Sequence, residues 1–511
     1  MRALLSVADP DGIAELARAL AAQGVSVHVT APAYDALRAD GIGVHPATDL
    51  TGGAPLPADG VHPAIAAAIS VRRDHPDALA ALTAAGGAPI DLVVVALRPI
   101  VSPGEAEPPL DAALGRIDLT GTAHLALAAR NAGGVAAVAD ARRYPAIVAE
   151  LRRLGGIAPE TRLALAAEAL GAIAAHHAAA SALLARRGGA EFPDRLALVL
   201  EKVRDLGYGE NPHQRAAIYR EPGAPARGPL GAEVLAGTPP TFNDLLDLDA
   251  AWRIAADFGT PTCAIVKLQN PVGLASHATL AGAYRRALDG DPVAAMGAVV
   301  ALNRVVDADA AEELVTGAYE AVVAPGFDAA ARDILAERPG LALLAAPPAG
   351  ADEPARAETF LPDLRRIDGG YLAETPDHLE IEHGSLRVVT RRRPTLDELT
   401  DLLFAWRAVR HVRSNAVVLA HGAALVGIGA GQATRLAAVE IALHRAADRA
   451  GGAVLASDAY FPFADAIVLA AERGVTAVIQ PGGSVRDEMA VEVADRHHLA
   501  MVFTGRRHYR R

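Results

Sequence analysis

The sequence contains a single cysteine, Cys263, among its 511 residues. One cysteine excludes an internal disulfide and a metal site built from several thiolates, and no metal is predicted. Aromatic residues are rare, at 4%. No run of ~20 apolar residues free of charges and turn formers stands out, so no membrane-spanning segment is predicted. The first residues resemble a strand and lack the features of a signal peptide. We therefore expect a cytoplasmic protein without a membrane partner.

Basic residues are scarce as well. The chain has 48 lysines and arginines against 60 aspartates and glutamates, for a net charge of −12. Arginines gather only at residues 391–393 and 506–511. A sequence-independent grip on nucleic acid needs a basic surface, because its affinity comes largely from neutralised phosphates. We expect no nucleic-acid partner, and we interpret both clusters as solvated surface or local anion sites.

Hydrophobic residues make up 51% of the chain, and its length predicts about three domains or subdomains. Residues 1–190 alternate strand and helix signals in the manner of a doubly wound α/β sheet. The clearest are strands at 3–7, 25–30 and 90–96 and helices at 13–23, 34–40 and 159–187. Gly188 and Gly189 mark a predicted domain boundary.

The alternation restarts after residue 190, which again predicts an α/β fold. The predicted strands lie at 264–266, 298–302, 321–324, 416–419, 453–457, 477–480 and 501–504. A stretch rich in proline, alanine and glycine at 345–354 is a predicted loop or linker. No internal repeat is visible in the residues themselves.

Polar segments adjoin several of these strands. Residues 207–214 (G-Y-G-E-N-P-H-Q) form either a plain turn or a loop that presents polar side chains to a ligand, and both interpretations stay open. Lys267 ends a strand before a predicted tight turn at 270–273. Open α/β sheets bind ligands at such places, although a surface lysine is commoner. Residues 427–432 are glycine-rich but match no nucleotide-binding pattern. Residues 456–463 concentrate aromatics, which suit ring stacking or core packing.

In this order the segments resemble a bifunctional family that combines aminoimidazole carboxamide ribonucleotide (AICAR) formyltransferase with inosine monophosphate (IMP) cyclohydrolase. The resemblance is dense over residues 208–509, through motifs such as YGENPHQ, RSNAVVLA and ASDAYFPF, and weaker before residue 190. It implies a methylglyoxal-synthase-like, cyclohydrolase-type domain at 1–190 and a formyltransferase-like domain at 191–511. The second domain would hold two cytidine-deaminase-like α/β subdomains, at about 195–370 and 390–511. The resemblance also implies a homodimer.

The same resemblance implies the site residues. Lys267 and Asn415 take the catalytic positions, with 10-formyltetrahydrofolate as formyl donor and a nucleotide as acceptor. The residues in the positions of substrate or cofactor contacts are Tyr208, His213, Asn243, Asp244, Asn270, Met296, Glu320, Arg435, Phe461 and Pro462.

The chain departs from the family's pattern at its base, because Leu268 stands where the family has a histidine. The acceptor amine must lose a proton as it attacks the formyl carbon, and a positioned base typically contributes ~10²–10⁴-fold. Lys267 and Asn415 are still expected to stabilise the developing oxyanion. His213 and His277 are alternative bases, although a structural role is the commoner interpretation of each.

The cyclohydrolase-type domain departs further. Residues 29–33 read V-T-A-P-A where the family has a phosphate loop of glycines and hydroxyls, which removes N–H donors and adds bulk. Arg98 and Arg130 replace a tyrosine and a lysine, and only Asp118 is kept. We predict a vestigial cyclohydrolase site at these three residues.

Three functions stay open. The leading hypothesis is a formyltransferase acting on AICAR or a related amino-heterocycle ribonucleotide, in purine or specialised nucleoside biosynthesis. Changed acceptor contacts are indicated by Gly207 and Arg511, which replace an arginine and a histidine of the family. A second hypothesis is a catalytically silent nucleotide- and folate-binding homologue or scaffold. A third is ring closure to IMP in a site rebuilt around Asp118.

Overall fold

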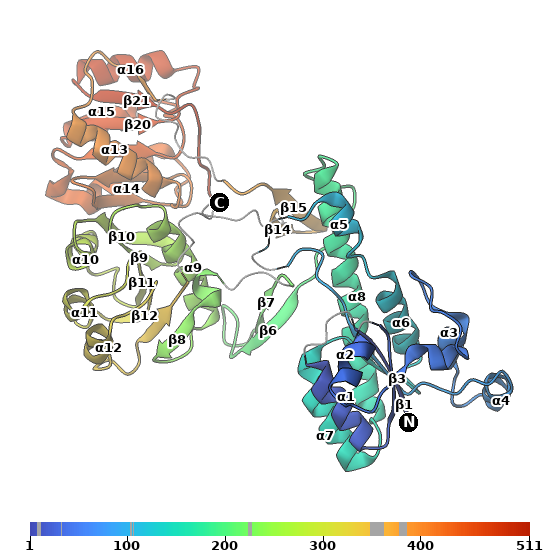
Figure 1. Cartoon of the computed structure of the whole chain (residues 1–511). Helices are drawn as coiled ribbons and strands as arrows, with labels where there is room; N and C mark the ends of the chain where they lie inside the picture. Colours follow the sequence, from blue (N-terminus) through green and yellow to red (C-terminus); the bar gives the residue numbers. More distant parts are fainter. Residues whose placement is uncertain are drawn as a thin grey trace. The chain divides into compact units, whose positions relative to one another are not determined.

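The computed structural model describes residues 1–7, 12–31, 33–102, 105, 107–222, 227–347, 362–377 and 386–511. The chain divides into two compact units, Met1–Val203 with Tyr219–Ala224 and Arg204–Ile218 with Pro225–Arg511. Figure 1 labels the elements of both. Pro32 of the replaced phosphate loop and residues 348–354 of the predicted linker lie outside the described residues.

The first unit is a parallel sheet with helices on both faces. Its elements are β1 (Arg2–Val7), α1 (Ile13–Ala22), β2 (Ser26–Val29), α2 (Ala33–Ala39), β3 (His45–Pro46), η1 (Ala47–Thr51), α3 (Pro63–Ser70), α4 (Pro76–Ala84), β4 (Leu92–Ala96), α5 (Leu110–Leu114), α6 (Leu119–Arg130), β5 (Ala136–Val138), η2 (Ala141–Arg143), α7 (Tyr144–Leu154) and α8 (Pro159–Arg187). The strand order is β3-β2-β1-β4-β5. Leu5 and Val94 pack with α1 and α7, whereas Leu4 and Val93 pack with α3 and α6, because successive side chains point to opposite faces. The predicted strands and helices of this unit are confirmed.

Helix α8 is 29 residues long and, by length and composition alone, could cross a membrane. It contains Glu168 and Gly171, so it is not a run of apolar residues free of charges and turn formers. Within the first unit α8 packs on α6 and β5 and buries Leu165, Ala169 and Leu183. One apolar face of the helix therefore belongs to the core of the unit. Leu163 and Leu170 lie on the remaining surface, 69% and 53% exposed.

The second unit contains, in its described residues, two six-stranded sheets of the same construction. The first comprises β8 (Glu233–Ala236), α9 (Phe242–Ala256), β9 (Thr262–Lys267), β10 (Asn270–Ser276), α10 (Leu280–Leu288), β11 (Ala298–Leu302), α11 (Ala308–Leu314), β12 (Tyr319–Ala324), α12 (Ala329–Leu335) and β13 (Ala342–Ala345). The second comprises β16 (Arg387–Val388), α13 (Leu396–Val409), β17 (Val417–Ala420), β18 (Leu425–Gly429), α14 (Arg435–Ala446), η5 (Ala447–Ala450), β19 (Val454–Ser457), α15 (Asp465–Glu472), β20 (Ala477–Gln480), α16 (Asp487–Arg496) and β21 (Ala500–Phe503).

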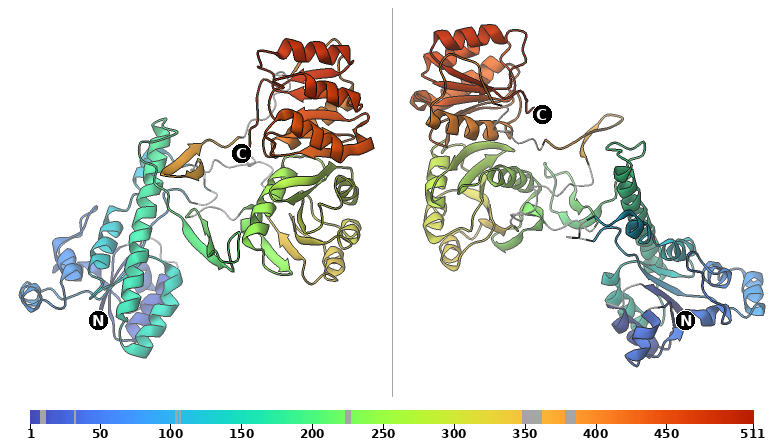
Figure 2. Two further views of the ribbon diagram at one scale, coloured as in Figure 1. Left: turned by 180° about the vertical axis from the view of Figure 1, so that it is seen from behind. Right: turned by 45° about the horizontal axis from the view of Figure 1, so that its top comes forward.

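Both sheets follow one topology. A helix leads into an antiparallel hairpin, and parallel strands and a last antiparallel strand complete the sheet. The strand orders are β10-β9-β11-β12-β13-β8 and β18-β17-β19-β20-β21-β16. Helices α9 and α13 share one core with the facing sides of both sheets, while α10 to α12 and α14 to α16 cover the outer sides (Figure 2).

The two halves also share a few fold-defining residues at the same spacing, a repeat that was not visible in the sequence. Thr241 and Thr395 each cap their helix through a capping box. Asp247 and Asp401 follow six positions later in each half. Each aspartate accepts the N–H groups of two consecutive turn residues in the following hairpin. The spacing from cap to turn is therefore the same in both halves.

A pair of glycines extends the equivalence. A Cβ on Gly273 would lie 2.1 Å from the carbonyl oxygen of Ala287, and a Cβ on Gly427 would lie 2.1 Å from that of Ala442. Both glycines let a hairpin strand approach the helix that follows it. The repeat escaped notice in the sequence because it keeps such fold-defining positions and varies most residues between them.

The turn after Lys267 also differs from the prediction. Residues 270–273 were expected to form it, but they begin β10, and Leu268 and Gln269 close the hairpin. Pro271 fits because β10 is an edge strand with an irregularity between Pro271 and Gly273. Residues 427–429, expected in a turn, belong to β18. The remaining elements are η3 (Gly228–Gly231) and two hairpins, β6 (Glu201–Leu206) with β7 (Ala216–Arg220) and β14 (Asp363–Ile367) with β15 (Gly370–Glu374).

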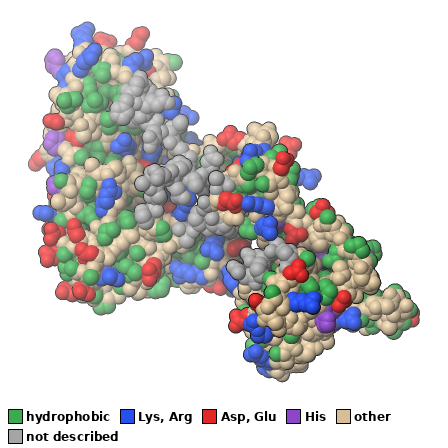
Figure 3. All heavy atoms as spheres, viewed as in Figure 1, with side chains coloured by type: hydrophobic (Ala, Val, Ile, Leu, Met, Phe, Trp, Pro, Cys, Tyr) green, Lys and Arg blue, Asp and Glu red, His purple; other side chains and the backbone are tan. Residues whose placement is uncertain are grey.

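Charged side chains of both signs are interspersed on the face drawn in Figure 3. Within the arginine cluster at 391–393, Arg392 donates to Glu398 at 2.7 Å. Arg391 forms an ion pair with Asp495 at 3.6 Å. These two arginines therefore take part in local ion pairs.

Candidate active site

Lys267 is the last residue of β9, and its ammonium donates a hydrogen bond to the carbonyl of Met296 at 2.6 Å. Leu268 and Gln269 follow with φ angles of 52° and 60°. Two consecutive left-handed residues are typical of a two-residue hairpin turn. Leu268 is 77% exposed, so this turn presents an aliphatic side chain to solvent directly beside the lysine.

The carboxylate of Asp247, on α9, binds the backbone of this turn. Its two oxygens accept the N–H of Leu268 at 2.9 Å and the N–H of Gln269 at 2.6 Å. Burial raises the pKa of Asp247 above its usual value, although the two N–H donors and the charge of Lys267 oppose that rise. The sequence motifs did not single out this aspartate.

Helix α9 also reaches the loop at residues 207–214. Asn243 lies four residues before Asp247 and therefore on the same face of the helix. Its side-chain amide donates to the carbonyl of Glu210 at 3.3 Å. The loop that carries Tyr208 and His213, both exposed, thus lies at the same end of α9 as the lysine turn.

Three further predicted contacts surround these groups. Asp244 is engaged in the capping box of α9, where it accepts the backbone N–H of Thr241 at 2.9 Å. Met296 is 61% exposed. A Cβ on the following residue, Gly297, would lie 3.8 Å from the Lys267 nitrogen and 3.7 Å from a carboxylate oxygen of Glu320. Lys267 and Glu320 therefore approach the same glycine.

Asn270 connects the lysine turn to the second sheet. Its side-chain oxygen accepts the N–H of Arg413 at 3.1 Å, and its side-chain amide donates to the carbonyl of Leu268 at 3.1 Å. Arg413 lies two residues before Asn415. The segment that carries Asn415 is therefore held beside the turn that follows Lys267.

Asn415 itself is fixed by Gln432, in the loop after β18. Its backbone N–H and its side-chain amide both donate to the carbonyl of Gln432, at 3.2 and 2.7 Å. The N–H of Gln432 donates back to the carbonyl of Asn415 at 3.3 Å. These three bonds hold the Asn415 side chain in one orientation.

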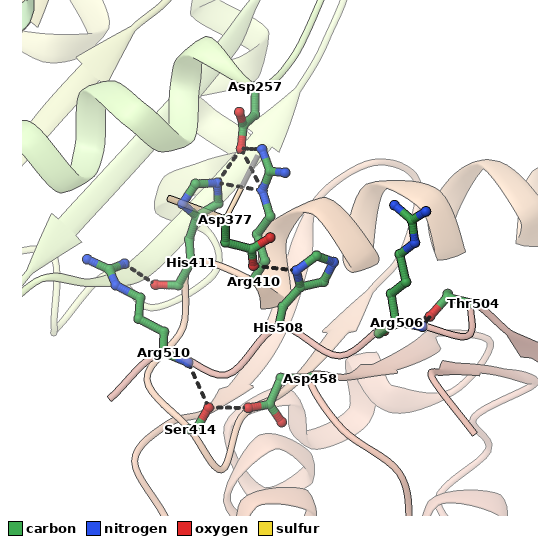
Figure 4. Close-up of polar contacts among 10 residues, drawn as sticks. All are labelled: Asp257, Asp377, Arg410, His411, Ser414, Asp458, Thr504, Arg506, His508 and Arg510. Atoms are coloured by element: carbon green, nitrogen blue, oxygen red, sulfur yellow. Dashed lines mark hydrogen bonds and ion pairs between the residues drawn. The ribbon is translucent and has the colours of Figure 1, made fainter. Parts of the chain in front are cut away.

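A buried carboxylate, Asp458, organises the neighbouring residues. It accepts hydrogen bonds from the Ser414 hydroxyl and from the Ala416 N–H, the latter at 3.2 Å, and it forms an ion pair with Arg435. Figure 4 shows Ser414 between Asp458 and the backbone N–H of Arg510, which donates to the serine hydroxyl at 3.0 Å. Asp458 is fully buried and Arg435 is 6% exposed, so this arginine serves the interior of the site.

A pocket of about 500 Å³ opens beside Asn415, lined by Arg413, Ser414, Asn415, Gly431, Tyr509 and Arg511. The chain end that supplies its last two residues is held by Arg510, which donates to the carbonyl of His411. Burial lowers the pKa of the Arg510 guanidinium, and the charges of Arg253, Arg413 and Arg365 lower it further. The pocket therefore lies in a cationic environment that favours an anionic ligand.

The aromatic segment divides into buried and exposed members. Phe461 is 1% exposed and packs in the core between β19 and the outer helices, while Pro462 is half-buried. Tyr460 and Phe463 are 38% and 56% exposed, and the guanidinium of Arg486 lies 4.7 Å from the centre of the Phe463 ring. The rings that can meet a ligand in this segment are therefore those of Tyr460 and Phe463.

The two alternative bases lie in different places. His277 follows β10, whose pairing runs from Asn270 opposite Lys267 to Ser276 opposite Thr262. A strand of seven residues spans roughly 20 Å, so His277 lies too far from Lys267 to act as its base. His213 is exposed in the loop beside the start of α9 and is not separated in this way.

In the first unit Asp118 caps α6 and accepts the N–H of Gly121 at 2.6 Å. The backbone N–H of Asp118 donates to His176 at 3.0 Å. Arg98 is exposed just after β4, and α6 packs on that strand. Arg130 is the last residue of α6, and 12 helical residues put it roughly 18 Å from Asp118 along the axis. The described geometry thus places Arg130 at the other end of the helix.

Comparison with known proteins identifies the family of the chain. The model of the AICARFT/IMPCHase bienzyme family matches residues 128–445. The bifunctional purine biosynthesis protein PurH of Thermoanaerobacter sp. (strain X514) is 38% identical over 513 residues, covering 100% of this chain and 99% of that protein. The PurH protein of Sorangium cellulosum (strain So ce56) is 43% identical over 534 residues, with the same coverage. The chain belongs to the AICARFT/IMPCHase bienzyme family.

A further relative in this family is PurH of Myxococcus xanthus (strain DK1622), 42% identical over 434 residues and covering 84% of each chain. The crystal structure of ForH matches 36% of this chain and 98% of its own at 29% identity, with a TM-score of 0.32 that carries no argument. The family resemblance inferred from the motifs is therefore confirmed.

The structure adds residues to the candidate site that the sequence analysis did not assign a role. Arg413, Gly431 and Tyr509 line the pocket, Asp458 is its buried anchor, and Asp247 binds the lysine turn. Arg413 and Asp458 lie within the quoted motifs RSNAVVLA and ASDAYFPF, so membership of a motif offered a signal. The role of Asp247 could not be read from the sequence, because it depends on a backbone turn that the sequence placed two residues too late.

Proposed function

We propose that the second unit transfers a formyl group from 10-formyltetrahydrofolate to the amine of AICAR or of a related amino-heterocycle ribonucleotide, in purine or specialised nucleoside biosynthesis. The observation that carries the proposal is the bond from Arg413 to Asn270, which holds Asn415 beside the turn of Lys267. The ammonium of Lys267 and the side-chain amide of Asn415 are the two donors that the proposal assigns to this part of the site.

The chemistry assigned to these residues is electrostatic. The folate donor supplies the formyl group, and a new carbon–nitrogen bond forms to the acceptor amine while the bond to the folate nitrogen breaks. Negative charge develops on the formyl oxygen, and preorganised donors at such an oxygen are often the largest catalytic contribution. Lys267 and Asn415 are the donors. Leu268 holds no proton acceptor, so the amine proton leaves to water or to His213, and the departing folate nitrogen takes up a proton from solvent.

The pocket beside Asn415 is proposed to hold the acceptor. Arg413 and Arg511 line it and carry two of the charges that make it attractive to an anion. Guanidinium groups bind phosphate oxygens with paired hydrogen bonds, which suits the 5′-phosphate of a ribonucleotide. The exposed apolar side chains of Leu268 and Met296 offer a surface for the planar donor.

We further propose the architecture and assembly that the family resemblance implies. The first unit is a methylglyoxal-synthase-like domain, and the halves of the second unit are two cytidine-deaminase-like subdomains. The protein acts as a homodimer in the cytoplasm on small-molecule nucleotide and folate, without nucleic acid or membrane. The repeated topology of the two halves supports the pair of related subdomains.

The test is single-turnover formyl transfer to AICAR, with the wild type beside Leu268→His. Histidine is among the residues that tolerate a left-handed backbone, so it fits the φ of 52° at this position. We expect slow transfer in the wild type and a gain of ~10²-fold in the variant, since a positioned base contributes about that much. Lys267→Ala in each background should abolish transfer.

Other outcomes identify the alternatives. Transfer by Leu268→His alone would mean that the wild type is a silent binding homologue with intact pockets. If neither protein reacts with AICAR or binds it in titration calorimetry, formyl transfer to this acceptor is wrong. Ring closure in the first unit is a separate reaction, and incubation with the formylated nucleotide while IMP absorbance is followed tests it. Asp118, the retained residue of that site, is the one to substitute.

A further inference from the structure

The turn between β9 and β10 has a backbone that its own residues do not favour. Both Leu268 and Gln269 are left-handed, with φ of 52° and 60°. Residues with a Cβ avoid this region, and two-residue turns of this type prefer Asn-Gly, Asp-Gly or Gly-Gly. Left to its sequence, a Leu-Gln pair would not select this conformation. Another part of the protein must therefore hold it.

Asp247 supplies the restraint. One carboxylate accepts both turn N–H groups, at 2.9 and 2.6 Å, and hydrogen bonds to an ionised acceptor are stronger than neutral ones. The carboxylate is itself fixed, because its neighbours on α9, Leu248 and Ala251, are fully buried in the shared core. The turn is thus tied to a helix that packs in the core shared by both sheets.

The repeat provides a natural comparison. In the second half Asp401 accepts the N–H of Gly422 and of Ala423, both at 2.7 Å, and both residues are left-handed with φ of 58°. The residue before that turn is His421, in the position that Lys267 occupies in the first half. Chelation of the turn by aspartate is therefore common to both halves, but only one turn follows the proposed catalytic lysine.

We propose that Asp247 is a positioning residue for formyl transfer, which fixes the turn so that the Lys267 ammonium stays between the Met296 carbonyl and Glu320, where the formyl oxygen will develop charge. The inference rests on the proposed function and deepens it. Asp247 touches no reacting atom. It acts through the backbone of Leu268 and Gln269 and through its negative charge near Lys267.

The experiment compares Asp247→Asn with Asp401→Asn in the full-length protein. Asparagine keeps one acceptor oxygen but turns an NH₂ group towards the second N–H, so one of the two bonds is lost in each variant. Urea unfolding should show a similar decrease in the free energy of unfolding for both variants. We expect the kcat of formyl transfer to fall about tenfold to a hundredfold in Asp247→Asn, as for other small misplacements of a catalytic group. The KM of Asp247→Asn for nucleotide should stay within about twofold of the wild-type value. The kcat of Asp401→Asn should also stay within about twofold of the wild-type value.

A second substitution separates positioning from general damage. Glycine adopts the left-handed region without strain, so Gln269→Gly added to Asp247→Asn should restore most of the lost kcat. Equal losses of kcat in the two aspartate variants, or no recovery with Gln269→Gly, would overturn the proposal.

A spectroscopic readout keeps this test apart from the proposed function. If the wild type transfers no formyl group, the proposed function fails and turnover is uninformative. In that case the positioning role is tested by the nitrogen NMR signal of the Lys267 ammonium and by the hydrogen-exchange rates of the Leu268 and Gln269 amides. We expect the signal to move and the exchange to quicken in Asp247→Asn but not in Asp401→Asn. An unmoved lysine signal would overturn the positioning role.

Discussion

At the scale of single residues, the site is built on groups whose partners are distant in sequence. Asn270 meets Arg413, and Asp458 meets Arg435 and Ser414. These residues lie in the sequence motifs, but their pairing is not visible there. A sequence shows which residues are polar but not which of them will face each other.

The structure buries two residues that the sequence analysis predicted as ligand contacts. Phe461 and Arg435 both occur in motifs, and both are almost fully buried, one in an apolar core and the other against Asp458. The composition of an aromatic-poor chain made Phe461 conspicuous, but composition cannot tell an exposed ring from a packed one. The exposed rings are those of its neighbours, Tyr460 and Phe463.

His124 gives the first unit a specific dependence on pH. It is 2% exposed, and neither ring nitrogen has a hydrogen-bond partner in the part of the chain that the structure describes. Burial lowers its pKa to about 4, with a small opposing effect of Asp118. The unfolded chain therefore binds a proton below pH ~6.5 that the folded unit refuses, and stability falls as pH drops from there towards 4.

The predicted change is the removal of this loss in His124→Leu. At pH 5 the histidine should cost the wild type about 2 kcal/mol relative to pH 7, since each tenfold difference in proton affinity between the folded and unfolded chain is worth about 1.4 kcal/mol. Urea unfolding of the first unit at pH 7 and pH 5 measures the difference. His177→Leu, an exposed position on α8, is the control and should keep the wild-type slope. Equal slopes in both variants would contradict the assignment.

At the scale of elements, the apolar strands were predictable and the hairpin partners were not. The apolar composition of buried runs such as β4 and β20 predicts them as strands. The predicted bounds of β11 and α8 agree with the structure to the residue. The strand β10 was missed because it contains Asn270, Pro271 and Gly273, which are typical turn formers. An edge position tolerates them, and edge position is a property of the sheet, not of the strand.

Gly273 is the element-scale prediction. A Cβ at this position would stand 2.1 Å from the carbonyl oxygen of Ala287, so Gly273→Ala must push β10 away from α10. We expect a loss of about 1–3 kcal/mol in the free energy of unfolding, as for other overpacked sites. Gly259→Ala is the matched control, because its Cβ would meet nothing within 4 Å. Urea midpoints within error of each other would refute the close approach.

At the scale of the second unit, the two halves are joined through equivalent positions. Asp257 lies 16 residues after the cap Thr241, and His411 lies 16 residues after the cap Thr395. Figure 4 shows Asp257 contacting His411 and its neighbour Arg410, whose Nε lies 3.1 Å from the carboxylate. Burial opposes ionisation of Asp257, but the bonds from His411 and Arg410 lower its pKa overall. One carboxylate thus links the ends of α9 and α13.

Removing that carboxylate should loosen the two halves together. Asp257→Ala leaves the partly buried side chains of Arg410 and His411 without their partner. Breaking a fully buried pair from one side costs about 3–5 kcal/mol, so we expect a loss of about 2–3 kcal/mol here. Asp249→Ala removes a pair with Arg253 in which both side chains are half-exposed, and it should cost below about 1 kcal/mol. Chemical unfolding monitored by Trp252 and Trp406, one in each half, measures both. Loss confined to one tryptophan signal would argue against a shared link.

The repeat within the second unit has a consequence for how the site arose. Fusion of two copies of one gene produces a chain whose halves share caps, chelating aspartates and close-approach glycines at one spacing. Before such a fusion, two identical subunits would have presented two identical turns. On that history, the lysine at 267 and the histidine at 421 would descend from one ancestral position, whose two copies now carry different side chains.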